Sequence, residues 1–151
     1  FAQTWAAILD VTAILIFILT YIFVANRRFL ALSRVVSVIG VVLFFPYQLL
    51  LASLLSNIQF FGSSVQYIPV AILIFIYSVL LRKSEPKLSR GLFIGATILC
   101  LSLVFRTIDE PLCSVLSAGT HFVWHIVNAI MLSWMIEILR THMLAGYSLG
   151  R

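Results

Sequence analysis

Two histidines lie four positions apart in the segment AGTHFVWHIVNAI (118–130), which is otherwise almost entirely apolar. On a helix, His121 and His125 would share one face with their Cβ atoms about 6 Å apart, a separation at which two imidazoles can chelate one metal ion. Zinc takes imidazole readily, and a catalytic zinc has three protein ligands and one position open to water. The pair therefore predicts two ligands of a zinc site and leaves the third to be found.

Other interpretations of the pair remain open. Both histidines could lie in the interior of a helical bundle and bond to backbone carbonyls. Haem is less favoured, because axial ligands approach from opposite faces and usually come from different helices. Histidine within a membrane span is costly and usually marks function, which favours a metal site.

The third ligand has several candidates. His142 lies 21 residues after His121, which is about 30 Å along a helix and too far to share an ion. The remaining candidates are acidic or thiol side chains that we expect on the same side of the protein: Asp10, Asp109, Glu110 and Cys113. Asp10 could bind the metal directly or act beside it as a base, and the other three are expected in a loop.

The composition indicates an integral membrane protein. The chain is 62% hydrophobic and 10% charged, with a mean hydropathy of +1.13, whereas soluble domains are about 45–50% apolar and about 25% charged. The net charge of +5 does not indicate nucleic acid as a partner. The basic residues lie in short loops between apolar runs, where they act as topology signals.

Five apolar runs predict an all-α fold with about five transmembrane helices in a single membrane domain, residues 1–151. They cover roughly residues 4–25, 35–55, 67–81, 91–105 and 120–139. Each is near the ~20 residues that a ~30 Å hydrocarbon layer requires, although the third and fourth are marginal. The polar segments 82–90 and 106–119 are expected to be loops.

The distribution of lysine and arginine predicts the orientation. The loops around Arg27 and across 82–90 are basic, as is the C-terminal tail. The loop 56–66 has no basic residue, and the loop 106–119 has one arginine against two acidic residues. The positive-inside rule therefore places the C-terminus in the cytoplasm and residue 1 outside. Asp10, His121 and His125 would then lie in the outer half of the membrane and could form a common site.

Three segments resemble the alkaline ceramidase family, which belongs to a membrane hydrolase superfamily that also includes the adiponectin-type receptors. They are TWAAILDVTAILIFILTYIFVANRRF (4–29), RTIDEPLC (106–113) and GTHFVWHIVNA (119–129). Asp10 matches an aspartate early in the family's third span, and His121 and His125 match a histidine pair that opens the seventh. Asp109 and Cys113 match an Asp-x-x-x-Cys element before that last span.

The resemblance implies a seven-helix bundle, of which this chain would supply the third through seventh spans. The family holds zinc with three histidines, and its first histidine and a nearby serine are expected upstream of Phe1. The chain would then be an N-terminally truncated fragment that is inactive alone. In the complete protein, zinc would activate water to hydrolyse the amide bond of ceramide or a similar lipid amide, with Asp10 as general base.

The alternative is a non-enzymatic protein on the same helical bundle. It would be either a receptor-like relative or a transporter in which Asp10 and the histidines relay protons or cations. In both cases we expect a multi-pass protein of a bacterial inner membrane that is surrounded by membrane lipids.

Overall fold

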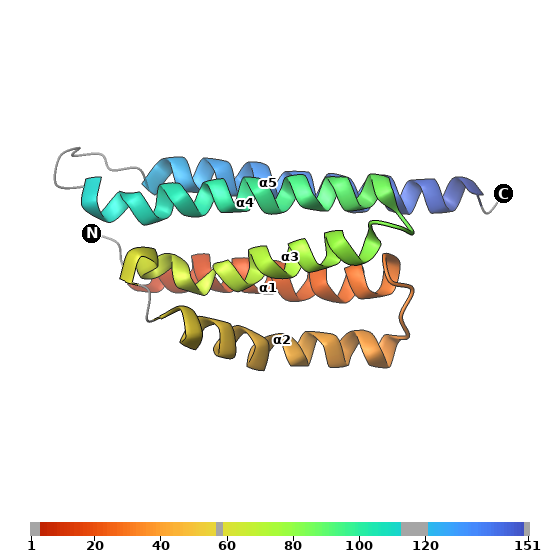
Figure 1. Ribbon diagram of the computed structural model, residues 1–151, viewed down its shortest axis with the longest axis horizontal. Helices are drawn as coiled ribbons and strands as arrows, with labels where there is room; N and C mark the ends of the chain where they lie inside the picture. Colours follow the sequence, from red (N-terminus) through yellow and green to blue (C-terminus); the bar gives the residue numbers. More distant parts are fainter. Residues whose placement is uncertain (1–3, 57–58, 113–120, 150–151) are drawn as a thin grey trace. The chain divides into compact units, whose positions relative to one another are not determined.

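A computed structural model of the protein describes residues 4–56, 59–112 and 121–149 (Figure 1). Its elements, in chain order, are α1 (Thr4–Arg28), α2 (Arg34–Leu55), the 3₁₀ segment η1 (Gln59–Gln66), α3 (Ile68–Leu81), α4 (Pro86–Leu112) and α5 (His121–Leu149). These residues contain no strand. The predicted all-α fold is confirmed to that extent.

Five stretches of the described chain are long and apolar enough to cross a membrane. They are Ile8–Arg28, Arg34–Leu55, Ser64–Leu81, Pro86–Asp109 and Phe122–Gly146. The third, which the sequence leaves marginal, reaches 18 residues because the end of η1 continues into α3. Pro46 lies inside α2 without ending it.

The chain divides into two compact units, Phe1–Tyr47 and Gln48–Arg151. In the first, Asn26 is buried near the end of α1, beside Gly40 of α2. A Cβ at Gly40 would lie 2.5 Å from Asn26 Nδ2, so any larger residue at this position would force the Asn26 side chain to move. Arg27 donates a hydrogen bond to the carbonyl of Leu32 across the connecting loop, at 2.6 Å.

In the second unit, α4 packs against both α3 and α5. Two buried serines join α3 to α4 through reciprocal hydrogen bonds. Ser78 Oγ donates to the carbonyl of Ser89 at 2.8 Å, and Ser89 Oγ donates to the carbonyl of Ser78 at 2.7 Å. Hydroxyls that bond across helices are a typical way of joining apolar helices, which gain little from hydrophobic contact within a membrane.

Glycines on α4 allow α5 to approach closely. Trp134 Nε1 donates to the carbonyl of Gly91 at 2.9 Å, and a Cβ at Gly95 would lie 2.6 Å from Met135 Sδ. Met135 is almost completely buried in this contact zone. Small residues at the contact therefore set how near the two helices lie.

Three predicted helix ends are wrong. Helix α4 begins at Pro86, within the segment 82–90 that the sequence predicts to be a loop. Helix α4 continues to Leu112 through residues expected in a loop, so Asp109 is helical. Thr107 helps to hold this extension, because its hydroxyl bonds to the carbonyl of Leu103 and to Ser64 of η1. Contacts with other elements thus outweigh the local polar sequence.

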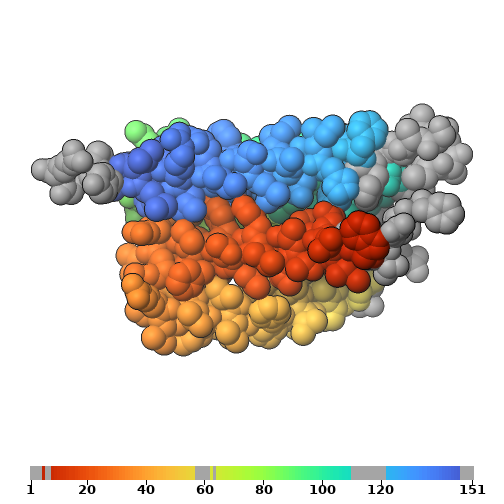
Figure 2. All heavy atoms as spheres, turned by 180° about the vertical axis from the view of Figure 1, so that it is seen from behind, coloured from red at the N-terminus to blue at the C-terminus, as the bar shows by residue number. Residues whose placement is uncertain are grey.

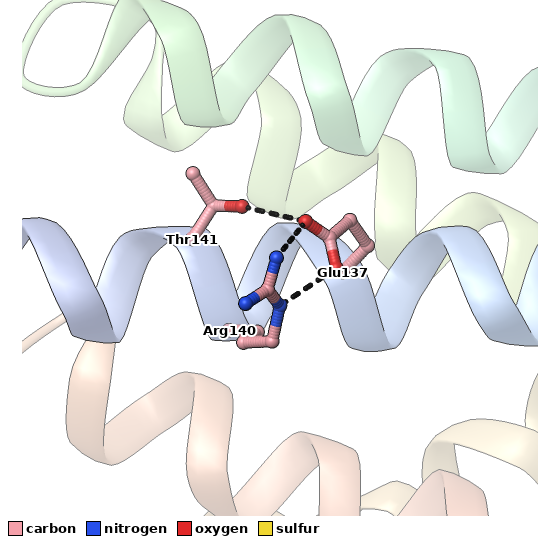
Figure 3. A network of polar contacts seen from close by, with 3 residues as sticks. All are labelled: Glu137, Arg140 and Thr141. Atoms are coloured by element: carbon pink, nitrogen blue, oxygen red, sulfur yellow. Dashed lines mark hydrogen bonds and ion pairs between the residues drawn. The ribbon is translucent and has the colours of Figure 1, made fainter.

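Helix α5 likewise runs to Leu149 rather than ending near residue 139. Glu137 and Arg140 form a bidentate ion pair on its surface, and Thr141 also donates to Glu137 (Figure 3). Along α5, coloured blue in Figure 2, large apolar side chains are exposed, among them Phe122, Ile126 and Ile130. Such a surface suits a lipid environment better than water.

Candidate functional site

Helix α5 carries both histidines of the predicted zinc site. It begins at His121, and His125 follows one turn later on the same helix. The side chain of His121 lies outside the described part of the structure. The side chain of His125 is exposed, and its imidazole lies against the indole of Trp124, with ring centroids 4.2 Å apart and ring planes at 60°.

Trp124 is the largest of the fully buried side chains that the structure describes, with 1% of its surface exposed. The guanidinium carbon of Arg106 lies 4.4 Å from the indole centroid and 4.9 Å from the ring centroid of Tyr67. The two aromatic rings are themselves 6.1 Å apart. We call Tyr67, Arg106 and Trp124 the Arg106 cluster; it joins α4 and α5 to the residue that precedes α3.

Sequence reasoning missed the Arg106 cluster, because it placed Arg106 in a loop and interpreted aromatic residues near span ends as interfacial anchors. A signal was present: Ser102 and Arg106 are separated by one helical turn and lie on one face if the helix continues. Ser102 Oγ donates to the carbonyl of Trp124 at 3.3 Å. Both residues of this face therefore contact Trp124.

Asp10 lies on α1 with an exposed side chain. It belongs to the unit Phe1–Tyr47, whereas the histidines belong to Gln48–Arg151. The structure therefore brings His121 and His125 together on one helix. A common site with Asp10 stays a prediction.

The described residues contain no group of three histidine, cysteine, aspartate or glutamate side chains that could hold a metal ion. His142 is on α5, but it lies 21 residues beyond His121, about 30 Å along the helix, and cannot ligate the same ion. Asp109 is on α4, while Cys113 and the side chain of Glu110 lie outside the described residues. Two imidazoles on consecutive turns match the donor type and spacing of zinc, so the residues present fit part of a tetrahedral site.

An apolar cavity of about 300 Å³ lies between α3 and α4. Ile72 and Phe75 line it from α3, and Leu103 lines it from α4. Ser64 and Thr107, which follows Arg106 in the chain, also line the cavity. Their hydroxyls are hydrogen-bonded to each other at 2.9 Å. The cavity thus suits a hydrocarbon chain and offers polar atoms only at one end.

Comparison with known proteins finds no matching family model, and neither a curated protein nor a solved structure matches the chain. The likeness to the alkaline ceramidases therefore stays a prediction from the residues of the three quoted segments.

Proposed function

We propose that this chain is part of a zinc-dependent membrane hydrolase. It cleaves the amide bond of ceramide or a similar lipid amide and releases a fatty acid and a sphingoid base. The observation that carries the proposal is the position of His121 and His125 on the first two turns of α5. They lie within a set of helices apolar enough to span a membrane, where histidine is costly unless it has a function.

In this proposal the two histidines supply two imidazole nitrogens to zinc, and a third histidine comes from sequence upstream of Phe1. Zinc, when bound, supplies a Lewis acid that polarises the amide carbonyl and lowers the pKa of water. Asp10 accepts the proton of the attacking water and returns it to the amine that leaves. The balance is a simple hydrolysis: the C–N bond breaks, a C–O bond forms, and one water is consumed.

An apolar cavity in the same unit as the histidines is compatible with a lipid as substrate. The cavity between α3 and α4 is lined almost entirely by hydrocarbon, with the Ser64–Thr107 hydroxyl pair as its polar end. A lipid amide has the same arrangement, because its polar amide is joined to long acyl chains. The basic loops further favour a cytoplasmic C-terminus and a site in the outer half of the membrane. The proposal takes this membrane to be a bacterial inner membrane.

The test is release of fatty acid from a fluorescent ceramide by the complete protein. We expect Asp10→Asn to retain zinc and to lose most turnover, because the amide cannot accept the proton. Thr12→Ala is the matched control: Thr12 is exposed on α1, its hydroxyl bonds within the same helix to the carbonyl of Ile8, and turnover should be unchanged. Full turnover by Asp10→Asn would remove its role as base. Stoichiometric zinc without any hydrolysis by the wild type would instead support the non-enzymatic alternative.

A further inference from the structure

We infer that Arg106 is a positioning residue for the metal-binding face of α5. Its guanidinium stacks on Trp124, and Trp124 in turn contacts the imidazole of His125. The inference rests on the proposed function, in which His125 is a zinc ligand. It assigns a role to a residue that touches neither the metal nor the substrate.

The first step is the orientation of Trp124, which α4 fixes at two points. Arg106 covers the indole ring at 4.4 Å, and Ser102 Oγ bonds to the backbone carbonyl of the same residue. Tyr67 contacts both the guanidinium and the indole, so three planar groups limit one another's movement. With 1% of its surface exposed, the indole is enclosed by neighbouring atoms, which restricts its movement.

The second step leads from Trp124 to His125. Neighbouring residues on a helix point about 100° apart, so their rings meet only in a restricted set of rotamers. The 4.2 Å separation of the two ring centroids shows that such a set is adopted. Since the indole is fixed, it excludes part of the space open to the imidazole. Groups that hydrogen-bond to a ligating histidine from outside the metal's own coordination typically contribute about 10–100-fold to metal affinity. Arg106 acts by stacking and through Trp124, so the lower end of that range is expected for it.

The third step is the reason why this position requires arginine rather than lysine. Among the described residues, no acceptor lies within hydrogen-bond distance of the buried Arg106 Nε, and the guanidinium carbon lies over two aromatic rings. Stacking on these two rings therefore holds the guanidinium over Trp124. A planar guanidinium can stack on an aromatic face, whereas the ammonium of lysine offers only a point charge.

The experiment measures zinc affinity of the complete protein by competition with a chromogenic chelator, together with its thermal midpoint. We expect Arg106→Gln to weaken zinc binding by about 10-fold, and Arg106→Lys to fall between that variant and the wild type. Ser78→Ala is the control for stability, because its hydrogen bond joins α3 to α4 away from the cluster. It should lower the thermal midpoint and leave zinc affinity unchanged.

Wild-type zinc affinity in Arg106→Gln would overturn the inference, as would an equal loss of affinity in Ser78→Ala. If Arg106→Gln does not fold, Tyr67→Leu tests the same point by removing one ring and should weaken zinc binding to a smaller extent. The failure of the proposed function looks different: His125→Ala would then bind zinc as tightly as the wild type.

Discussion

The paired serines of α3 and α4 offer a quantitative test of how the second unit is held together. Ser78→Ala and Ser89→Ala each remove one hydroxyl that donates to the carbonyl of the other serine. Both side chains are buried, and the bond lengths of 2.8 and 2.7 Å are the usual ones for a hydroxyl donor. Each variant should therefore lose one good hydrogen bond.

Each substitution should lower the free energy of unfolding by about 1 kcal/mol, since hydrogen bonds between membrane helices average about 0.6 and reach about 1.7 kcal/mol. The double variant should lose about twice as much. Each donor bonds to a backbone carbonyl that survives truncation of the other side chain, so we expect a coupling energy below about 0.5 kcal/mol.

The assay is reversible unfolding of the protein in micelles, followed by circular dichroism, for the wild type, both single variants and the double variant. Ser133→Ala is the matched control, because its exposed hydroxyl bonds within its own helix to the carbonyl of Ala129; it should change stability by less than about 0.5 kcal/mol. Wild-type stability in both single variants would refute the reciprocal pairing. A coupling energy above about 1 kcal/mol would show that the hydroxyls bond mainly to each other.

Two further predictions concern helix packing and orientation. Gly95→Leu should lower the free energy of unfolding by about 1–3 kcal/mol, because the larger side chain overpacks the contact of α4 with α5. Gly146→Leu is the control and should not lower it, because nothing lies within 4 Å of a Cβ there. Equal losses of stability in denaturant titrations of the two variants would contradict this packing. A reporter fused after Arg151 should read as cytoplasmic and one inserted at residues 56–66 as external; the opposite result at either position would remove the basis for placing Asp10 and the histidines in one leaflet.

The apolar runs predict the number and the approximate positions of the helices, because the length of a hydrophobic run is a local property. The position at which α4 ends, by contrast, does not depend on the local sequence alone. It depends on Thr107 bonding to Ser64 and on Arg106 stacking on Tyr67, contacts that span about 40 residues of sequence. A polar run such as RTIDEP therefore resembles a loop until its partners are known.

The candidate site divides in the same way. The spacing of His121 and His125 predicts that both lie on one helix, and in the structure both belong to α5. The Arg106 cluster requires three separate segments to meet, and no periodicity along the chain contains that information. The stacking of the Arg106 guanidinium on Tyr67 and Trp124 can be recognised only when the positions of the three segments are known.

The central claim is that His121 and His125 hold zinc, and metal analysis of the purified complete protein tests it most directly. We predict about one zinc per chain in the wild type and in His142→Ala, since His142 is too far along α5 to share the ion. Loss of either ligand should leave an incomplete coordination set, so His121→Ala and His125→Ala should each contain almost none. Equal zinc content in all four proteins would contradict the claim.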